Sequence, residues 1–196
     1  MSEKKFYWIR VYFTGIVTIA ICALLIWDHY HGGIPSHHLF ANKDLPSISN
    51  WWGLLLLPIL TWFLLYLIHK RIIKEHSGNG DQLLNRKKLL SRFVGSLLFG
   101  ILLSVFFSFN FSDIPGFMML GVFPLALIFP IYRAECLLGF VIGMTYTFGT
   151  VLPTFIGSIL TIAAAILYIY VRPAILYLST RLSALLMPDK NNRSNK

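Results

Sequence analysis

The stretch CLLGFVIGMTYTFGTVLPTFIGSILTIAAAILYIYV, residues 136–171, decides the fold of this chain. It runs for 36 residues without a charged side chain, whereas one membrane-spanning helix needs about 20 apolar residues. Leu152-Pro153-Thr154 lies near its middle, and a proline at this place favours a turn. The stretch is therefore predicted to form two consecutive transmembrane helices, 136–151 and 155–171.

Four further apolar segments precede this stretch. They are predicted as helices over residues 8–27, 51–68, 93–109 and 116–132, the last of them carrying two prolines. Of all residues, 56% are hydrophobic and only 13% are charged, and the mean hydropathy is +0.67. A soluble domain carries about twice that share of charge, so this chain cannot cover a water-facing surface. We expect an all-α integral membrane protein, a single polytopic bundle of about six transmembrane helices within residues 1–187.

The positions of the basic residues predict the orientation of this bundle. Lys and Arg gather in the cytoplasmic loops of membrane proteins. With six spans and the N-terminus inside, 16 of the 17 basic residues are cytoplasmic and only Lys43 is outside. With five spans, 11 basic residues would be inside and 6 would be outside. We therefore predict a protein of the cytoplasmic (inner) membrane with both termini in the cytoplasm.

Two segments extend the predicted cytoplasmic side. Residues 69–92 form a predicted basic loop facing anionic lipid, which accounts for the net charge of +9 without a nucleic-acid partner. Residues 174–187 place leucine and isoleucine on one helical face and are predicted to lie as an amphipathic helix on that leaflet. Residues 188–196 are predicted to be a disordered tail. The expected partners are the lipid bilayer and, in one interpretation, another membrane protein.

The predicted outer loop, residues 28–50, is dense in side chains that bind metals. Imidazole nitrogens, together with carboxylate oxygens, are ligands for zinc and other divalent transition metals. Gly32-Gly33 permits a sharp reversal that would bring the histidines on its two sides together. The candidate ligands are four of the six histidines of the chain: His29, His31, His37 and His38.

Asp28 and Asp44 are the candidate catalytic residues of the same loop. Each could act as a general base, as a ligand, or as the group that orients a histidine. Two other interpretations stay open at this point. In the first, the polar side chains only cap a helix end and shape a turn. In the second, the histidines sense pH.

Three features outside this loop also carry expectations. Asp113 is interpreted as a helix cap on the outer side, within reach of the histidine loop in a bundle. Glu135 is interpreted as half of a local ion pair with Arg133. Gly139 and Gly143 form a G-x-x-x-G motif, which favours close helix packing, here inside one chain rather than between two.

These observations lead to functions of different classes. In the first, the protein is a transporter, a metal handler or an accessory subunit, and its outer loop binds a metal ion or a proton. In the alternative, it is a metal-dependent membrane enzyme acting on a lipid or lipid-linked substrate at the outer face. None of the predicted helices carries an ionisable residue at its centre, which counts against an ion pump.

Overall fold

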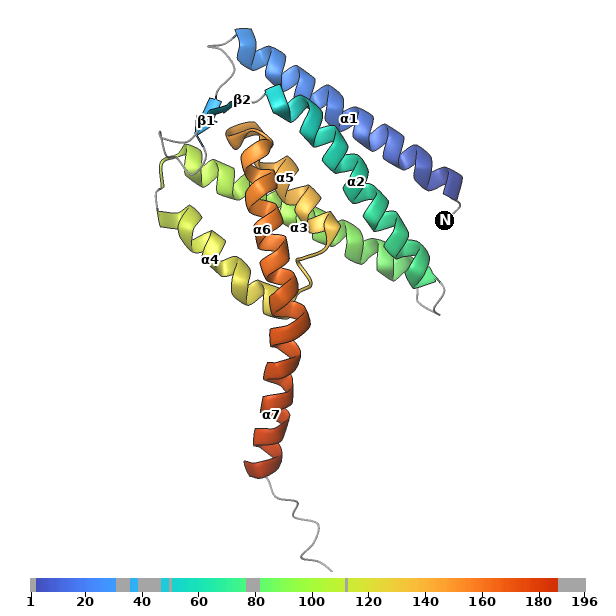
Figure 1. Ribbon diagram of the computed structural model, residues 1–196, viewed down its shortest axis with the longest axis vertical. Coiled ribbons are helices and arrows are strands. Elements are labelled where there is room, and N and C mark those ends of the chain that lie inside the picture. The colour runs from blue at the N-terminus through green and yellow to red at the C-terminus, as the bar shows by residue number, and fades with distance from the viewer. Residues whose placement is uncertain are drawn as a thin grey trace, which may run out of the picture.

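A computed structural model describes residues 3–30, 36–38, 47–49, 51–76, 82–111 and 113–186 of this protein, and the side chains within 4–30, 51–74, 84–111 and 113–182. The described chain is almost entirely helical (Figure 1). Its helices are α1 (Glu3–Tyr30), α2 (Trp51–His76), α3 (Gln82–Ser108), α4 (Asp113–Ile128), α5 (Ala134–Phe148), α6 (Val151–Ile166), the π-helical segment η2 (Leu167–Val171) and α7 (Arg172–Leu186). Between α1 and α2, the short strands β1 (Ser36–His38) and β2 (Ser47–Ser49) pair in antiparallel fashion.

Four helical runs are long and apolar enough to cross a membrane: α1, α2, α3 and the continuous helix built from α6, η2 and α7. The apolar helices α4 and α5 have only 16 and 15 residues. At about 1.5 Å per residue, each is shorter than the hydrocarbon core of roughly 30 Å. The prediction of an all-helical membrane protein is thus confirmed, while the number of six spans stays a prediction.

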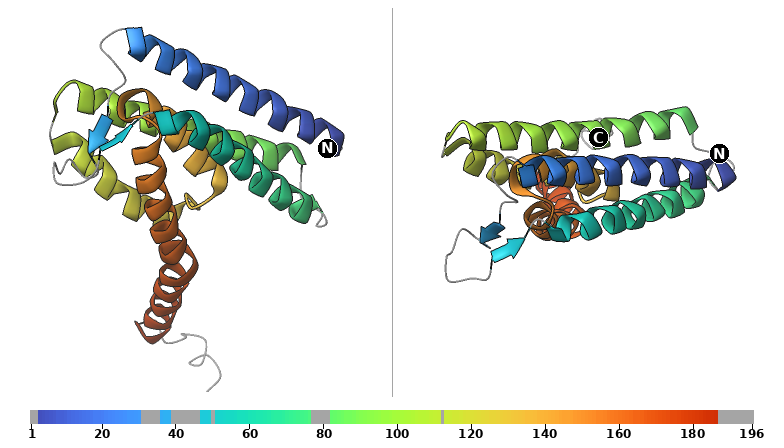
Figure 2. Two further views of the ribbon diagram at one scale, coloured as in Figure 1. Left: turned by 45° about the horizontal axis from the view of Figure 1, so that its top comes forward. Right: turned by 90° about the horizontal axis from the view of Figure 1, so that it is seen from above.

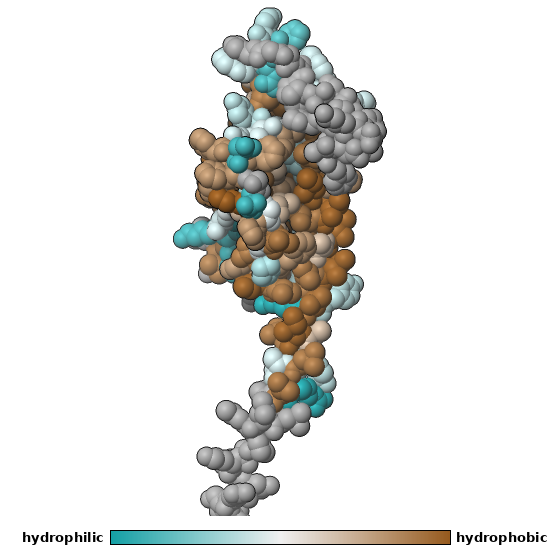
Figure 3. Space-filling view, turned by 90° about the vertical axis from the view of Figure 1, so that its left-hand side faces the viewer, coloured by the Kyte–Doolittle hydropathy of each residue, from teal (hydrophilic) through white to brown (hydrophobic). Residues whose placement is uncertain are grey.

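The outer surface of the helices is apolar, as a lipid-facing surface must be. Ile16 and Ile19 of α1 and Leu55 and Ile59 of α2 all expose more than half of their side-chain surface. Figure 3 shows the same character over most of the bundle on one face. Because a helix satisfies its own backbone hydrogen bonds, such a surface is stable in lipid and unstable in water.

The helix α5 forms the centre of the bundle. Its side chains Glu135, Leu138 and Val141 are at most 1% exposed, and α3, α2 and α6 pack around it. Gly139 and Gly143 of α5 lie directly against the backbone of α3, where a Cβ atom would collide with main-chain oxygens. The motif therefore packs inside one chain, as predicted. Neighbouring helices enclose α5, so its length need not match the bilayer.

Contacts between helices define one end of the bundle. Phe6 near the start of α1 stacks on His69 near the end of α2, and α1 runs alongside α2 (Figure 2). Leu89 of α3 packs against the same cluster. We call this the basic end, because it holds most of the basic residues of these helices: Lys4, Lys5, Lys70, Arg71, Lys74, Arg86, Lys87, Lys88 and Arg92.

Several predicted boundaries move. The predicted loop 69–92 is mostly helix, since α2 continues to His76 and α3 begins at Gln82. Lys, Arg, Glu and Gln are good helix formers, so these helices continue past the apolar segments. The predicted outer loop does not start at residue 28 either, because α1 runs to Tyr30.

The prolines act differently from the prediction. Pro153 lies in the first turn of α6, where its missing N–H has no cost, and the turn before it falls at Gly149, whose φ is 69°. Pro130 lies beyond the end of α4 at Ile128. Pro173 is the second residue of α7, and the π-helical turn η2 before it joins α6 and α7 into one helix.

The helix α7 extends away from the bundle (Figure 1). Its side chains from Pro173 to Leu182 are all exposed. Exposed side chains fit either water or lipid around α7, so its predicted position on the membrane surface stays a prediction. The predicted tail, residues 188–196, lies outside the described residues.

Candidate functional site

A buried carboxylate joins three helices at the basic end. Glu135, in the first turn of α5, is completely buried. Arg71 of α2 donates two hydrogen bonds to it, from Nη1 to Oε2 at 2.9 Å and from Nη2 to Oε1 at 3.0 Å. Nη1 of Arg92, on α3, lies 3.6 Å from Oε1. Both arginine side chains keep about a quarter of their surface exposed, at 25% and 26%.

The placement of this cluster follows from its charges. A buried carboxylate is stable only when it is paired and hydrogen-bonded, and the two-pronged contact with Arg71 achieves both. The N-terminal turn of α5 adds a favourable helix dipole for the negative charge of Glu135. The cluster of Glu135, Arg71 and Arg92 carries one negative and two positive charges, so it is positive overall.

This cluster gives Glu135 two partners that the sequence analysis did not predict, while the predicted local pair with Arg133 stays a prediction. The carboxylate is held across helices, with Arg71 located 64 residues away in the sequence. The sequence does contain a signal for this role, because Glu135 is the single acidic residue between Asp113 and Asp189. It opens a glycine-containing apolar helix, where an acidic side chain needs a partner from elsewhere in the bundle.

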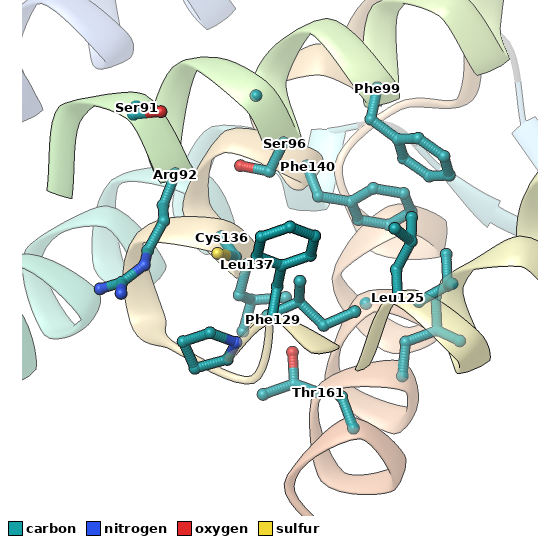
Figure 4. A pocket seen from close by; sticks show the side chains of 17 residues that line it. Ser91, Arg92, Ser96, Phe99, Leu125, Phe129, Cys136, Leu137, Phe140 and Thr161 are labelled. Atoms are coloured by element: carbon teal, nitrogen blue, oxygen red, sulfur yellow. The ribbon is translucent and has the colours of Figure 1, made fainter. Parts of the chain in front are cut away.

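A cavity of about 390 Å³ lies beside this cluster, between α3, α4, α5 and α6. Arg92 links the two, since it contacts Glu135 and also lines the cavity. Most of the lining is aliphatic or aromatic. Figure 4 shows two sides of different character, with Ser91, Arg92, Ser96 and Cys136 toward one side and Phe99, Leu125 and Phe140 toward the other.

The cavity runs along the direction of α3, from the basic end toward the middle of the bundle. Arg92 lies about three turns into this helix, and Phe99 lies about two turns further along it. The α6 hydroxyl of Thr161 also lines the space (Figure 4). Such a volume, mostly apolar with few polar groups, is typical of sites for small molecules with an apolar body.

The first part of the predicted metal site lies on α1. Asp28 and His29 are in the last turn of this helix rather than in a loop. The helix continues because nothing in its last turn breaks it before Tyr30. Among the described side chains, no three His, Cys, Asp or Glu residues come close enough to hold one metal ion.

The rest of the predicted metal site is described only in part. His37 and His38 belong to β1, whose backbone pairs His37 with Ile48 and His38 with Ser47 of β2. His31 and Asp44 lie outside the described residues. The metal prediction for this loop therefore stays a prediction. Asp113, interpreted as a helix cap, is the first residue of α4.

Compared with protein-family models, curated proteins and solved structures, the chain matches none of them. The fold and the site define a helical membrane protein with a partly open apolar cavity next to a buried carboxylate and its two arginines. Its function has to be argued from that site.

Proposed function

We propose that this protein binds one amphipathic lipid in the cavity between α3, α4, α5 and α6, as a lipid-binding transport or accessory protein of the membrane. The observation that supports this proposal is the cavity itself, which is apolar over most of its wall and polar at the side of Arg92. A membrane lipid has the same division into an apolar chain and a polar head. If the bound lipid were also converted, the protein would be a membrane enzyme.

The proposal includes a topology of six passes with both termini in the cytoplasm. Two contacts support it: Glu135 at the start of α5 meets Arg71 near the end of α2, and Thr150 just after α5 meets Gly53 near the start of α2. The short helix α5 thus reaches from the basic end to the opposite end of α2. Since basic residues favour the cytoplasm, the lipid enters from the cytoplasmic leaflet of the inner membrane, and α7 lies on that leaflet.

Photo-crosslinking tests the lipid proposal. The purified protein is placed in liposomes that contain phosphatidylcholine with a diazirine in its acyl chain, and the crosslinked peptides are mapped by mass spectrometry. We expect crosslinks to cavity residues such as Phe99, Leu125 and Phe140. Crosslinks confined to the lipid-facing surface, at Ile16 or Ile59 for example, would contradict the proposal.

A glycine on the cavity wall provides the matched variants. Gly95 lines the cavity, and a Cβ atom added there meets nothing within 4 Å. Gly95→Leu should fill part of the space and remove the cavity crosslinks without harming the fold. Gly15→Leu is the control, because Gly15 of α1 has equally open surroundings and does not line the cavity.

The outer histidine loop supports a second candidate function, metal binding. The pairing of β1 with β2 closes a hairpin, and Asp44 lies between these strands in the sequence. Metal content is measured by mass spectrometry on the protein without a histidine tag, and on a variant with His29, His31, His37 and His38 replaced by Ala. Stoichiometric zinc that disappears in the variant is the expected result. Protein without metal after incubation with zinc, copper and iron would exclude this function.

A further inference from the structure

We propose that the lipid carries an anionic head group and that Arg92 binds it. This inference rests on the proposed function, since it concerns the polar side of the same cavity. It adds a substrate class, because an anionic head group has a net negative charge for the cation to balance, whereas a zwitterionic head group balances its phosphate with its own cation and a neutral one has no charge. Arg92 is the residue that joins the buried cluster to the cavity.

The charge balance of the cluster is the first argument. Glu135 accepts one hydrogen bond from Arg71 on each of its two oxygens, so Arg71 alone neutralises it with ideal geometry. Arg92 contacts Glu135 only by a longer ion pair of 3.6 Å, beyond hydrogen-bond length. One guanidinium charge is therefore in excess, and it lies at the polar side of an otherwise apolar space.

The donor geometry of Arg92 is the second argument. A guanidinium group has five N–H donors in a planar fork, which suits the oxygens of a phosphate. The long ion pair to Glu135 holds the side chain in place and leaves donors for a ligand. In apolar surroundings a bond between this cation and an anion is stronger than it would be in water.

The position of Arg92 in the bundle is the third argument. It lies on α3 at the basic end, where the chain gathers its cations and where lipid head groups of one leaflet would lie. The cavity continues from there toward Phe99 and Phe140, deeper in the bundle. A lipid is favoured over a soluble anion, because a small anion would leave this apolar part unfilled.

Competition against the photoreactive phosphatidylcholine tests the inference. Unlabelled phosphatidylglycerol, phosphatidylcholine and diacylglycerol with identical chains are compared as competitors for the cavity crosslinks. In the native protein, phosphatidylglycerol should compete about tenfold better than the other two, as expected for one charge-assisted contact. Arg92→Gln should abolish this preference and keep the crosslinks, and Arg92→Lys should retain only part of it.

Lys88→Gln is the matched control, because it removes one positive charge from the same end of α3 at an exposed residue outside the cavity. It should keep the preference. Equal losses in Lys88→Gln and Arg92→Gln would overturn the inference and assign the preference to general attraction of anionic lipid. Equal competition by all three lipids in the native protein would also overturn it, while leaving lipid binding intact. Failure of the proposed function itself is recognised separately, by crosslinks that Gly95→Leu does not change.

Discussion

Arg71 is the residue on which the buried carboxylate of Glu135 depends. A buried ion pair contributes little compared with an apolar pair, but removing one partner leaves a charge without compensation. Arg71→Gln should therefore lower the free energy of unfolding by about 3 kcal/mol. Thermal unfolding in detergent, calibrated by denaturant titration, measures this change.

The double variant Arg71→Gln, Glu135→Gln is the control for this prediction. It removes both charges, so most of the lost stability should return. If the double variant lost as much stability as the two single variants together, the contact between Arg71 and Glu135 would not be the cause of the stability loss in Arg71→Gln. Arg92→Gln should be much milder than Arg71→Gln, because Glu135 keeps both of its hydrogen bonds.

At the scale of helices, the crossing of α3 and α5 determines where the site lies. A Cβ atom on Gly143 would be 2.5 Å from the main-chain oxygen of Leu97 and 3.2 Å from Cα of Gly100. Backbone atoms cannot move aside as a flexible side chain can, so Gly143→Ala should separate the helices and cost about 2 kcal/mol. The same unfolding measurement detects this loss.

Gly95→Ala on α3 is the control for helix propensity, since Gly95 has open space around it. It should leave stability unchanged or raise it slightly. If Gly143→Ala were equally harmless, the close approach of the two helices would be excluded as a source of stability. Because α3 and α5 both line the cavity, Gly143→Ala should also change its shape and weaken the cavity crosslinks.

At the scale of the whole molecule, the turn between α4 and α5 distinguishes six passes from four. With six passes, Arg133 faces the cytoplasm, and with four long spans alone it would stay on the outer side. In a background with Cys22 and Cys136 replaced by Ala, Arg133→Cys should react with a membrane-impermeant maleimide in inside-out vesicles.

The same variant should be protected in right-side-out vesicles. Lys43→Cys, the predicted outer site, gives the opposite pattern and serves as the control for vesicle orientation. Labelling of Arg133→Cys from the outer side would contradict six passes and would place the polar side of the cavity away from the cytoplasmic leaflet.

The sequence by itself determined the membrane character, the approximate helices and the close packing at Gly139 and Gly143. These depend on local properties, namely the length of an apolar run and the spacing of small residues along one helix. Only the tertiary structure decided the partners of Glu135 and the cavity beside Arg92. Lipid and protein interior are both apolar, so the sequence of an apolar helix does not reveal which of its faces contacts lipid and which contacts other helices. Four helices line the cavity, and Arg71, Arg92 and Glu135 meet only because α2, α3 and α5 pack together.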